Sequence, residues 1–204
     1  MKKCVIFGAG EYDESLPVRE EGDFFIAADG GLEAMLSRGF TPDLILGDFD
    51  SLKTSLPEGI PTVTLPVEKD VTDMDAAVAQ GLKRGYKLFL LYGGAGGRPD
   101  HTFANYSLLA RLSMNGCSAR LYGAGFTVSA ITDGCITLRG EKNKTVSVFS
   151  WTDVSEGVSI RGMKYNLENE TLTSSFALGV SNAFEREEGE ISVNKGTLLI
   201  MREL

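Results

Sequence analysis

Residues 43–51 read Asp-Leu-Ile-Leu-Gly-Asp-Phe-Asp-Ser, and this stretch runs a short apolar segment directly into two carboxylates separated by one residue. If the backbone stays extended past Leu46, Asp48 and Asp50 project to the same side, because side chains alternate across a strand. Two like charges held this close repel each other, and a divalent cation between them keeps both ionised. The alternative is a polar turn in which the Asp side chains bond to their own backbone.

The same order, an apolar strand followed by an acidic or glycine-rich turn, recurs along the first half of the chain. Such turns follow residues 28, 46, 65 and 92, and helical spacing fills 32–38, 76–84 and about 102–114. This alternation over the first 122 residues predicts an α/β domain with a mostly parallel, Rossmann-like sheet. Because the carboxyl ends of parallel strands share one edge, we expect the four turns to converge on one crevice.

After Gly123 the segments become short, β-branched and punctuated by Gly, Asn and Asp at roughly ten-residue spacing. They are residues 128–132, 135–138, 144–150, 157–161, 177–182, 189–194 and 197–201. This texture predicts an all-β sandwich or barrel, and we favour the sandwich. We therefore predict an α/β domain over residues 1–123 and a β-sandwich domain over residues 124–204.

Composition narrows the classes of protein and of partner. The chain has 204 residues, 43% hydrophobic and 24% charged, and a formal net charge of −8. This charge argues against nucleic acid as a partner, since phosphate backbones select basic faces. No apolar run approaches the length of a membrane span and no signal-peptide core follows the N-terminus, so we expect a cytoplasmic protein without a membrane partner. Three dispersed cysteines and one histidine favour neither disulfides nor a zinc site.

The segment 93–100 carries four glycines in five residues and then Arg98. Its backbone N–H groups, including those of Gly94 and Gly97, suit the binding of phosphate oxygens, and the following helix adds the positive end of its dipole. Arg98 offers a bidentate fork for a phosphate. The alternative is a flexible connection in which Asp100 caps the next helix.

Two further stretches are weaker on their own. Lys69, Asp73 and their acidic neighbours form either a charged helix start or a site for a nucleotide and its metal. Asp29 lies in an Asp-Gly-Gly turn. His101 is the one imidazole in the chain, and we assign it a structural or binding role in preference to that of general base.

Taken in order, these residues resemble the thiamine pyrophosphokinase family. The resemblance runs through nearly the whole chain and rests on Asp29-Gly30-Gly31, Gly47-Asp48-Phe49-Asp50-Ser51, Lys69-Asp70-x-Thr72-Asp73, Gly93-Gly94-x-Gly96-Gly97-Arg98-x-Asp100-His101, Gly162-x-Lys164-Tyr165-x-Leu167 and Ser181-Asn182. It implies an α/β domain that binds Mg-ATP, a C-terminal β-sandwich, and a homodimer whose thiamine pocket is shared between subunits. It also implies that Tyr165 stacks on the thiamine pyrimidine, near Ser181 and Asn182.

The reaction implied is transfer of a pyrophosphoryl group from ATP to the hydroxyl of thiamine, with AMP released. The catalytic residues would be Asp48, Asp50, Asp73 and Asp100. The first three of these would bind Mg²⁺. ATP would be held by Asp29, Lys69, Gly94, Gly97, Arg98 and His101. Asp73 would also face thiamine, and Asp73 or Asp100 would accept the hydroxyl proton.

Two other functions fit parts of the same pattern. One keeps the site and changes the acceptor to a hydroxymethylpterin or another small heterocyclic alcohol. The other is a non-catalytic sensor of a nucleotide or thiamine, although mere binding does not call for so many carboxylates.

Overall fold

The computed structural model describes residues 1–50, 55–68 and 70–204, and the chain divides into two units. The first comprises residues 1–105 and 121–124, and the second comprises residues 106–120 and 125–204. Helix α3 (Pro99–Met114) and strand β6 (Ser118–Gly123) each pass from one unit to the other. The predicted domain boundary after residue 123 stays a prediction.

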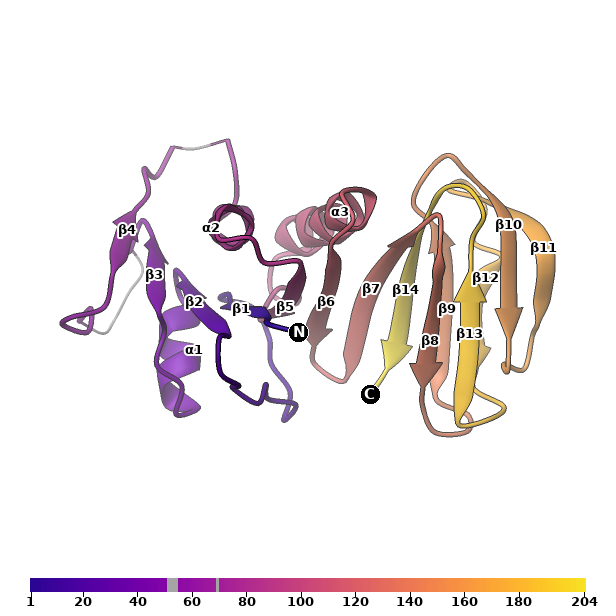
Figure 1. Cartoon of the computed structure of the whole chain (residues 1–204), viewed down its shortest axis with the longest axis horizontal. Helices are drawn as coiled ribbons and strands as arrows, with labels where there is room; N and C mark the ends of the chain where they lie inside the picture. Colours follow the sequence, from indigo (N-terminus) through magenta and orange to yellow (C-terminus); the bar gives the residue numbers. More distant parts are fainter. Residues whose placement is uncertain (51–54, 69) are drawn as a thin grey trace. The chain divides into compact units, whose positions relative to one another are not determined.

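The first unit contains a parallel sheet, as expected from its strand–helix alternation. Its strands are β1 (Cys4–Phe7), β2 (Phe24–Ala28), β3 (Leu44–Gly47), β4 (Thr62–Thr64) and β5 (Leu88–Tyr92). They lie in the order β5-β1-β2-β3-β4, and every pair among them is parallel (Figure 1). The carboxyl ends of all five therefore point to one edge.

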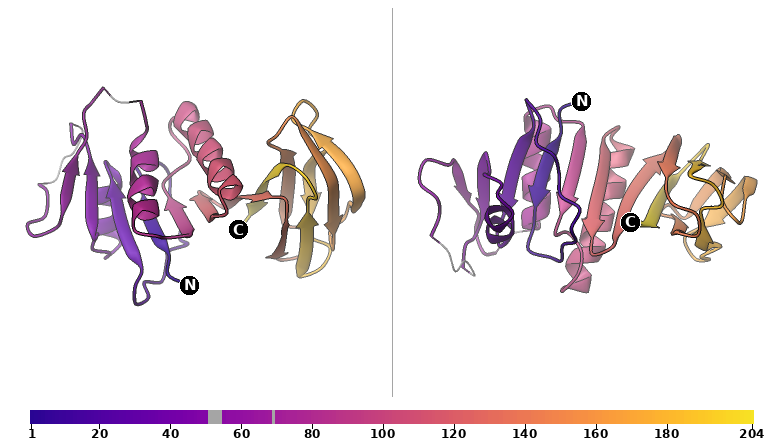
Figure 2. Two further views of the ribbon diagram at one scale, coloured as in Figure 1. Left: turned by 45° about the horizontal axis from the view of Figure 1, so that its top comes forward. Right: turned by 90° about the horizontal axis from the view of Figure 1, so that it is seen from below.

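Helices cover both faces of this sheet (Figure 2). Leu32 and Met35 of α1 (Gly31–Ser37) join Val5 and Phe7 in one buried cluster. On the opposite face, Gly81 of α2 (Asp73–Lys83) approaches the side chains of Cys4 and Phe89 so closely that an added Cβ would lie 2.8 and 2.6 Å from them. Alternation along β1 sends Cys4 and Val5 to opposite faces, so the two helices enclose the strands between them.

The second unit is built from antiparallel strands. They are β7 (Phe126–Thr132), β8 (Cys135–Arg139), β9 (Thr145–Ser150), β10 (Val154–Arg161), β11 (Leu167–Thr173), β12 (Gly179–Ala183), β13 (Glu188–Ser192) and β14 (Thr197–Glu203). One run has the order β12-β9-β14-β7 and a separate sheet has the order β11-β10-β13-β8. Residues of both, among them Val148, Ile160 and Ile200, form one buried cluster. The two layers thus share a core, as in a sandwich.

Strand β11 is absent from the sequence-based prediction. It lies at the edge of its sheet, and four consecutive residues, Glu168 to Thr171, are exposed. An edge strand of this kind lacks the apolar alternation by which a strand is recognised.

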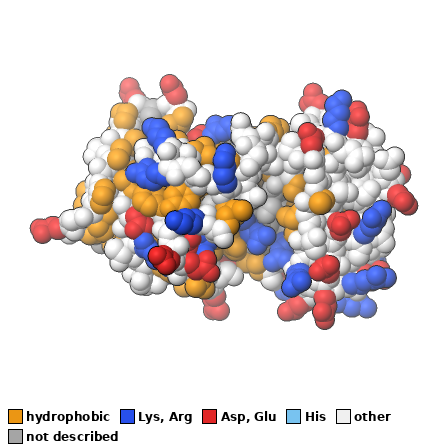
Figure 3. Space-filling view, viewed as in Figure 1, with side chains coloured by type: hydrophobic (Ala, Val, Ile, Leu, Met, Phe, Trp, Pro, Cys, Tyr) orange, Lys and Arg blue, Asp and Glu red, His pale blue; other side chains and the backbone are white. Residues whose placement is uncertain are grey.

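Acidic and basic side chains are interspersed over the face of the second unit that Figure 3 shows. Among the described residues, no helix has both the length and the apolarity to cross a membrane.

Candidate functional site

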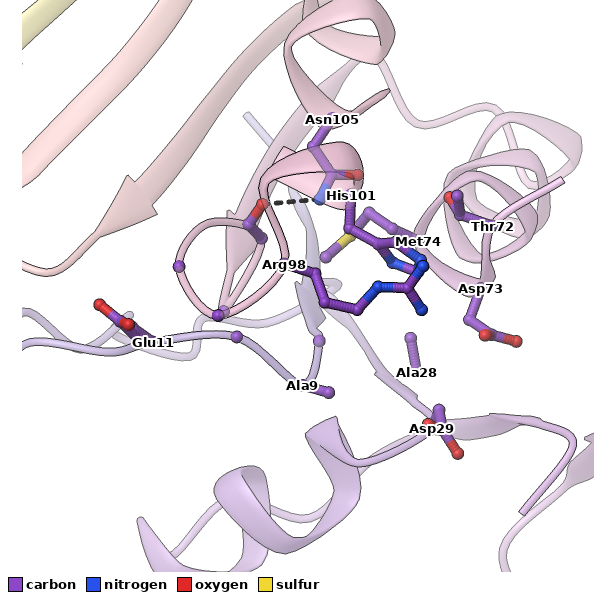
Figure 4. A pocket seen from close by; sticks show the side chains of 16 residues that line it. Ala9, Glu11, Ala28, Asp29, Thr72, Asp73, Met74, Arg98, His101 and Asn105 are labelled. Carbon is purple, nitrogen blue, oxygen red and sulfur yellow. Dashed lines mark hydrogen bonds between the residues drawn. The ribbon is translucent and has the colours of Figure 1, made fainter. Parts of the chain in front are cut away.

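A cavity of about 370 Å³ lies in the first unit, at the edge to which the carboxyl ends of its strands point. Its lining comes from the segments after β1, β2 and β5 and from the starts of α2 and α3 (Figure 4). The lining residues are Gly8 to Glu11, Ala28, Asp29, Thr72 to Met74, Gly93, Gly94, Gly96 to Arg98, His101 and Asn105. The cavity therefore joins six predicted site residues: Asp29, Asp73, Gly94, Gly97, Arg98 and His101.

Two glycine-containing loops are joined by backbone hydrogen bonds at the cavity wall. The N–H of Gly10 donates to the carbonyl of Gly93, and that of Glu11 donates to the carbonyl of Ala95, both at 2.8 Å. An added Cβ on Gly10 would lie 2.4 Å from the Ala95 oxygen, so the close approach requires glycine. Gly8 and Gly10 belong to the first of these loops, which lacks the third glycine of a dinucleotide-binding motif. Their role is to bring the two loops together.

Asp29 follows β2 and lines the cavity (Figure 4). Its N–H donates to the Leu46 carbonyl at 2.8 Å, which continues the pairing of β2 with β3 past the strand end. Its Oδ1 is buried and has no hydrogen-bond partner within the described part of the chain. A buried carboxylate oxygen without a donor lacks a partner that a cation or a donor group of a ligand would supply on binding.

Burial is the main cause that raises the pKa of the Asp29 carboxyl, and a hydrogen bond from the Gly30 backbone opposes it. The negative charges of Asp73, Asp48 and Asp50 raise this pKa further. These three carboxylates are therefore near enough to Asp29 to repel it. The end of β3 contributes to the same electrostatic environment although it does not line the cavity.

The backbone does not stay extended through Asp48 and Asp50, which corrects one sequence-based expectation. Phe49, between them, has a φ of +62°, and the N–H of Asp50 lies 3.5 Å from Oδ1 of Asp48. This is the polar turn that was the alternative interpretation. The side chains consequently do not gain a shared direction from strand alternation.

Asp73 is placed by the start of α2. Thr72 is the N-cap, and its side-chain oxygen accepts a hydrogen bond of 3.2 Å from the N–H of Asp75. The cap fixes the first helical turn, so Asp73 faces the cavity from a defined position (Figure 4).

Arg98 and Asp100 form an ion pair in which Nη2 lies 2.6 Å from Oδ2. This pairing is the main cause that lowers the pKa of Asp100 to about 2. Helix α3 starts at Pro99, three residues earlier than predicted, so Asp100 is in its first turn and is not an N-cap. Arg98 and His101 line the cavity, whereas Asp100 does not. Lys69 lies outside the described residues.

Asn105 is a lining residue that the sequence gave no reason to single out. It is 5% exposed, and its Nδ2 donates a hydrogen bond of 2.7 Å to the Gly94 carbonyl (Figure 4). It thereby fixes the glycine loop from the side of α3. A single amide within an amphipathic helix has no sequence signal that marks it as a site residue. Glu11 and Met74 also line the cavity and were not predicted as site residues.

Three candidate residues lie in the second unit. The side chain of Asn182 bonds to the backbone of Tyr165 on both sides, and Tyr165 is 59% exposed. Ser181 is exposed, has a φ of +60°, and donates its N–H to Oγ of Ser147 at 3.1 Å. The second unit thus brings Tyr165, Ser181 and Asn182 together.

Comparison with known proteins assigns both halves of the chain. A family model described as the catalytic domain of thiamin pyrophosphokinase matches residues 18–121, about half of the chain. A second, described as the vitamin B1 binding domain of thiamin pyrophosphokinase, matches residues 135–198. The chain belongs to the thiamine pyrophosphokinase family. It is accordingly an enzyme, a thiamine diphosphokinase.

Relatives within the thiamine pyrophosphokinase family match along most of their length. Thiamine pyrophosphokinase of Bacillus subtilis is 27% identical over 189 residues, which cover 90% of this chain and 88% of the relative. Thiamin pyrophosphokinase 1 of Caenorhabditis elegans is 27% identical over 170 residues, with 77% and 70% covered.

Solved structures of family members share the fold. The crystal structure of the Bacillus subtilis protein has a TM-score of 0.89 at 24% identity and covers 99% of both chains. That of thiamin pyrophosphokinase from Geobacillus thermodenitrificans has a TM-score of 0.82 at 25% identity, with 100% of this chain and 98% of the other covered. The yeast enzyme, at 14% identity, still gives 0.75 over 100% and 86% of the two chains.

Proposed function

We propose that this enzyme transfers a pyrophosphoryl group from ATP to the hydroxyl of thiamine, giving thiamine diphosphate and AMP with the help of Mg²⁺. The observation that carries the proposal is the cavity in the first unit. It combines two glycine loops, one arginine and two half-buried carboxylates in a chain of the thiamine pyrophosphokinase family. Glycine loops and an arginine suit phosphates, and carboxylates suit the metal that accompanies them.

The phosphate chain of ATP is assigned to the wall opposite Asp29 and Asp73. Backbone N–H groups of the 93–97 loop, with Gly94 and Gly97 among them, and the side chains of Arg98 and His101 would contact its oxygens. Asp29 belongs to the same ATP site. Lys69 is assigned to it from the sequence alone.

The carboxylates fit Mg²⁺ if the ion is shared with substrate. Over residues 1–50, 55–68 and 70–204, no three His, Cys, Asp or Glu side chains are grouped so as to hold a metal. Mg²⁺ usually takes one or two carboxylates and completes its shell with water and phosphate oxygens. Asp48, Asp50 and Asp73 are the assigned ligands, and the open Oδ1 of Asp29 adds a nearby oxygen. When bound, Mg²⁺ would offset the charge that develops on the leaving AMP.

The chemical step forms one bond and breaks one bond at the β-phosphorus. The hydroxyl oxygen of thiamine attacks, the bond between the β-phosphorus and the bridging oxygen to the α-phosphorus breaks, and AMP leaves with that oxygen. Asp100 is a poor acceptor for the hydroxyl proton, because Arg98 holds its pKa at about 2 and Asp100 does not line the cavity. Asp73 lines the cavity and is the acceptor that we propose. Alignment of the reactants supplies most of the remaining catalysis.

Thiamine is assigned to Asp73, Tyr165, Ser181 and Asn182, in a pocket shared between the subunits of a homodimer. Its thiazolium ring is cationic, and an acidic site favours it. The charge of −8 is consistent with such an acceptor. We place the enzyme in the cytoplasm.

Incubation with ATP, Mg²⁺ and thiamine tests the proposal, with AMP and thiamine diphosphate quantified together. We expect equimolar products, none of them in excess EDTA, and turnover lowered by at least ~100-fold in Asp48→Asn and Asp50→Asn. Formation of a diphosphorylated product from hydroxymethylpterin, and none from thiamine, would indicate that the acceptor is another heterocyclic alcohol. Binding of ATP or thiamine without release of AMP would indicate a non-catalytic sensor. Near-normal turnover of both variants would contradict the metal assignment.

A further inference from the structure

The side-chain amide of Asn182 is almost fully engaged within the protein. Its Oδ1 accepts hydrogen bonds of 2.9 Å from the N–H groups of Tyr165 and Ala183, and its Nδ2 donates one of 2.6 Å to the carbonyl of Tyr165. An amide offers two donor hydrogens and two acceptor lone pairs, so three of four positions are used. Asn182 is also only 4% exposed. Little of it remains for contact with a ligand.

An irregularity in β12 turns Asn182 inward. The pairing of β12 with β9 shifts register between Gly179 and Asn182, and the two residues between them, Val180 and Ser181, are both exposed. Ser181 has a φ of +60° at this point. Bulges of this kind redirect side chains. Here the consequence is that Asn182 faces the segment that carries Tyr165.

Tyr165 combines a fixed backbone with an exposed ring. Both of its backbone polar groups bond to Asn182, and the N–H of the preceding Lys164 donates to the Ala183 carbonyl at 2.9 Å. Nζ of Lys164 lies 5.3 Å from the ring centroid. A ring held in place from its backbone can stack on a flat ligand with little further loss of conformational freedom.

We propose that Asn182 is a positioning residue, which acts on thiamine through Tyr165 and does not contact thiamine itself. This inference rests on the proposed function and refines the role of Asn182 within it. The neutral aminopyrimidine ring would stack on the face of Tyr165 away from Lys164, since a cation already occupies the other face. Loss of the amide would leave the tyrosine in the chain but remove the two bonds that orient it.

Steady-state kinetics of Asn182→Ala provide the first test, with thiamine and ATP varied separately. Loss of two buried hydrogen bonds that orient the ring should raise the KM for thiamine about tenfold. The KM for ATP should change less than about twofold, because the ATP cavity lies in the other unit. Asn194→Ala makes the same chemical change at an exposed residue of the same unit and should leave both constants unaltered.

A double-mutant cycle with Tyr165→Ala separates positioning from direct contact. If Asn182 acts through the ring, Asn182→Ala should have no further effect on the KM for thiamine once the ring is absent. Additive effects would overturn the proposal and indicate that Asn182 contacts thiamine. An unchanged KM in Tyr165→Ala would also overturn it, while the wild-type products would still support the proposed reaction.

Hydrogen exchange and Asn182→Asp address the possibility of a folding defect. The backbone N–H of Tyr165 should exchange faster in Asn182→Ala, whereas protection of the β7, β9 and β14 amides should persist. Asn182→Asp keeps an acceptor for the two N–H groups but sets a carboxylate oxygen against the Tyr165 carbonyl in a buried position, so it should raise the KM at least as much as Asn182→Ala does. Wild-type exchange at Tyr165 in Asn182→Ala would overturn the proposal.

Discussion

Arg98 and Asp100 lie two residues apart at the start of α3, and the Arg98 guanidinium contacts both carboxylate oxygens of Asp100, Nη2 to Oδ2 at 2.6 Å and Nε to Oδ1 at 3.2 Å. Arg98 also lines the cavity, whereas Asp100 does not. The carboxylate therefore orients the guanidinium from outside the cavity lining. In the proposed function, Arg98 would contact phosphate directly and Asp100 would support it.

Substitution at these two positions should separate the direct role from the supporting one. Arg98→Ala should raise the KM for ATP by at least ~10-fold, because a charge-assisted contact to phosphate is lost. Asp100→Asn should raise it less, because the guanidinium remains. The pKa of Asp100, about 2, keeps it ionised above pH 4, so this support is lost only as the pH falls toward 2. A larger effect of Asp100→Asn than of Arg98→Ala on the KM for ATP would contradict this order.

Asp29→Asn should stabilise the ligand-free enzyme at neutral pH and damage catalysis. Burial raises the pKa of Asp29, so the native state binds this proton more tightly than the unfolded chain does. Stability contributed by the protonated form is present at low pH and is lost as the pH rises above about 4 through the raised value. An Asn side chain does not ionise, so the variant avoids this loss of stability. Its side-chain oxygen can still accept a hydrogen bond from the Gly30 N–H.

Thermal melts of wild type and Asp29→Asn at pH 7 and near pH 4 check this expectation. The variant should melt higher at pH 7, and the difference should shrink at the lower pH. Mg²⁺ should raise the melting temperature of the wild type more than that of the variant, because fewer carboxylates repel in the variant. A variant that melts lower than the wild type at pH 7 would contradict the charge argument.

Gly10→Ala should separate the two loops that meet at the cavity wall. The new Cβ would lie 2.4 Å from the Ala95 oxygen and 2.7 Å from the Gly93 oxygen, and both atoms are backbone. Overpacking against backbone costs about 1–3 kcal/mol, and relief of the clash would displace the 93–97 loop. The KM for ATP should therefore rise together with a loss of stability, measured by urea unfolding.

Gly134→Ala is the matched control for that substitution. The nearest atom to a Cβ on Gly134 is the Thr132 oxygen at 3.4 Å, which is an ordinary contact distance. This variant should bind ATP as the wild type does and lose little stability. Equal effects of the two substitutions would show that loop contact at Gly10 is not the cause.

The general layout of the first unit was predictable because two signals agree: the apolar pattern marks where each strand ends, and parallel pairing places all of these ends at one edge of the sheet. Apolar strands ending at Ala28 and Tyr92 deliver Asp29 and the glycine loop to one edge, and parallel pairing brings these together. The cap at Thr72 was also predictable, since a hydroxyl three residues before Asp75 is a local signal.

Other features depend on contacts that local sequence does not encode. The turn at Phe49 sets the directions of Asp48 and Asp50, and its positive φ is unusual for a bulky residue. The closeness of Gly10 to Ala95 arises only when β1 and β5 pair. Asn182 meets Tyr165 because β12 shifts register, and a register shift leaves no pattern in the chain.

Thr72 allows the contribution of the α2 cap to be measured separately from the charge of Asp73. Thr72→Ala removes the oxygen that accepts from the Asp75 N–H and should destabilise the enzyme by about 1 kcal/mol. Because the cap fixes the turn that carries Asp73, kcat should fall as well. Thr72→Ser keeps an equivalent oxygen and should restore both stability and kcat. A different outcome is that Thr72→Ser recovers stability but loses as much kcat as Thr72→Ala. Because Thr72 lines the cavity, this outcome would indicate that its methyl group contacts substrate and would contradict the explanation of kcat by the cap alone.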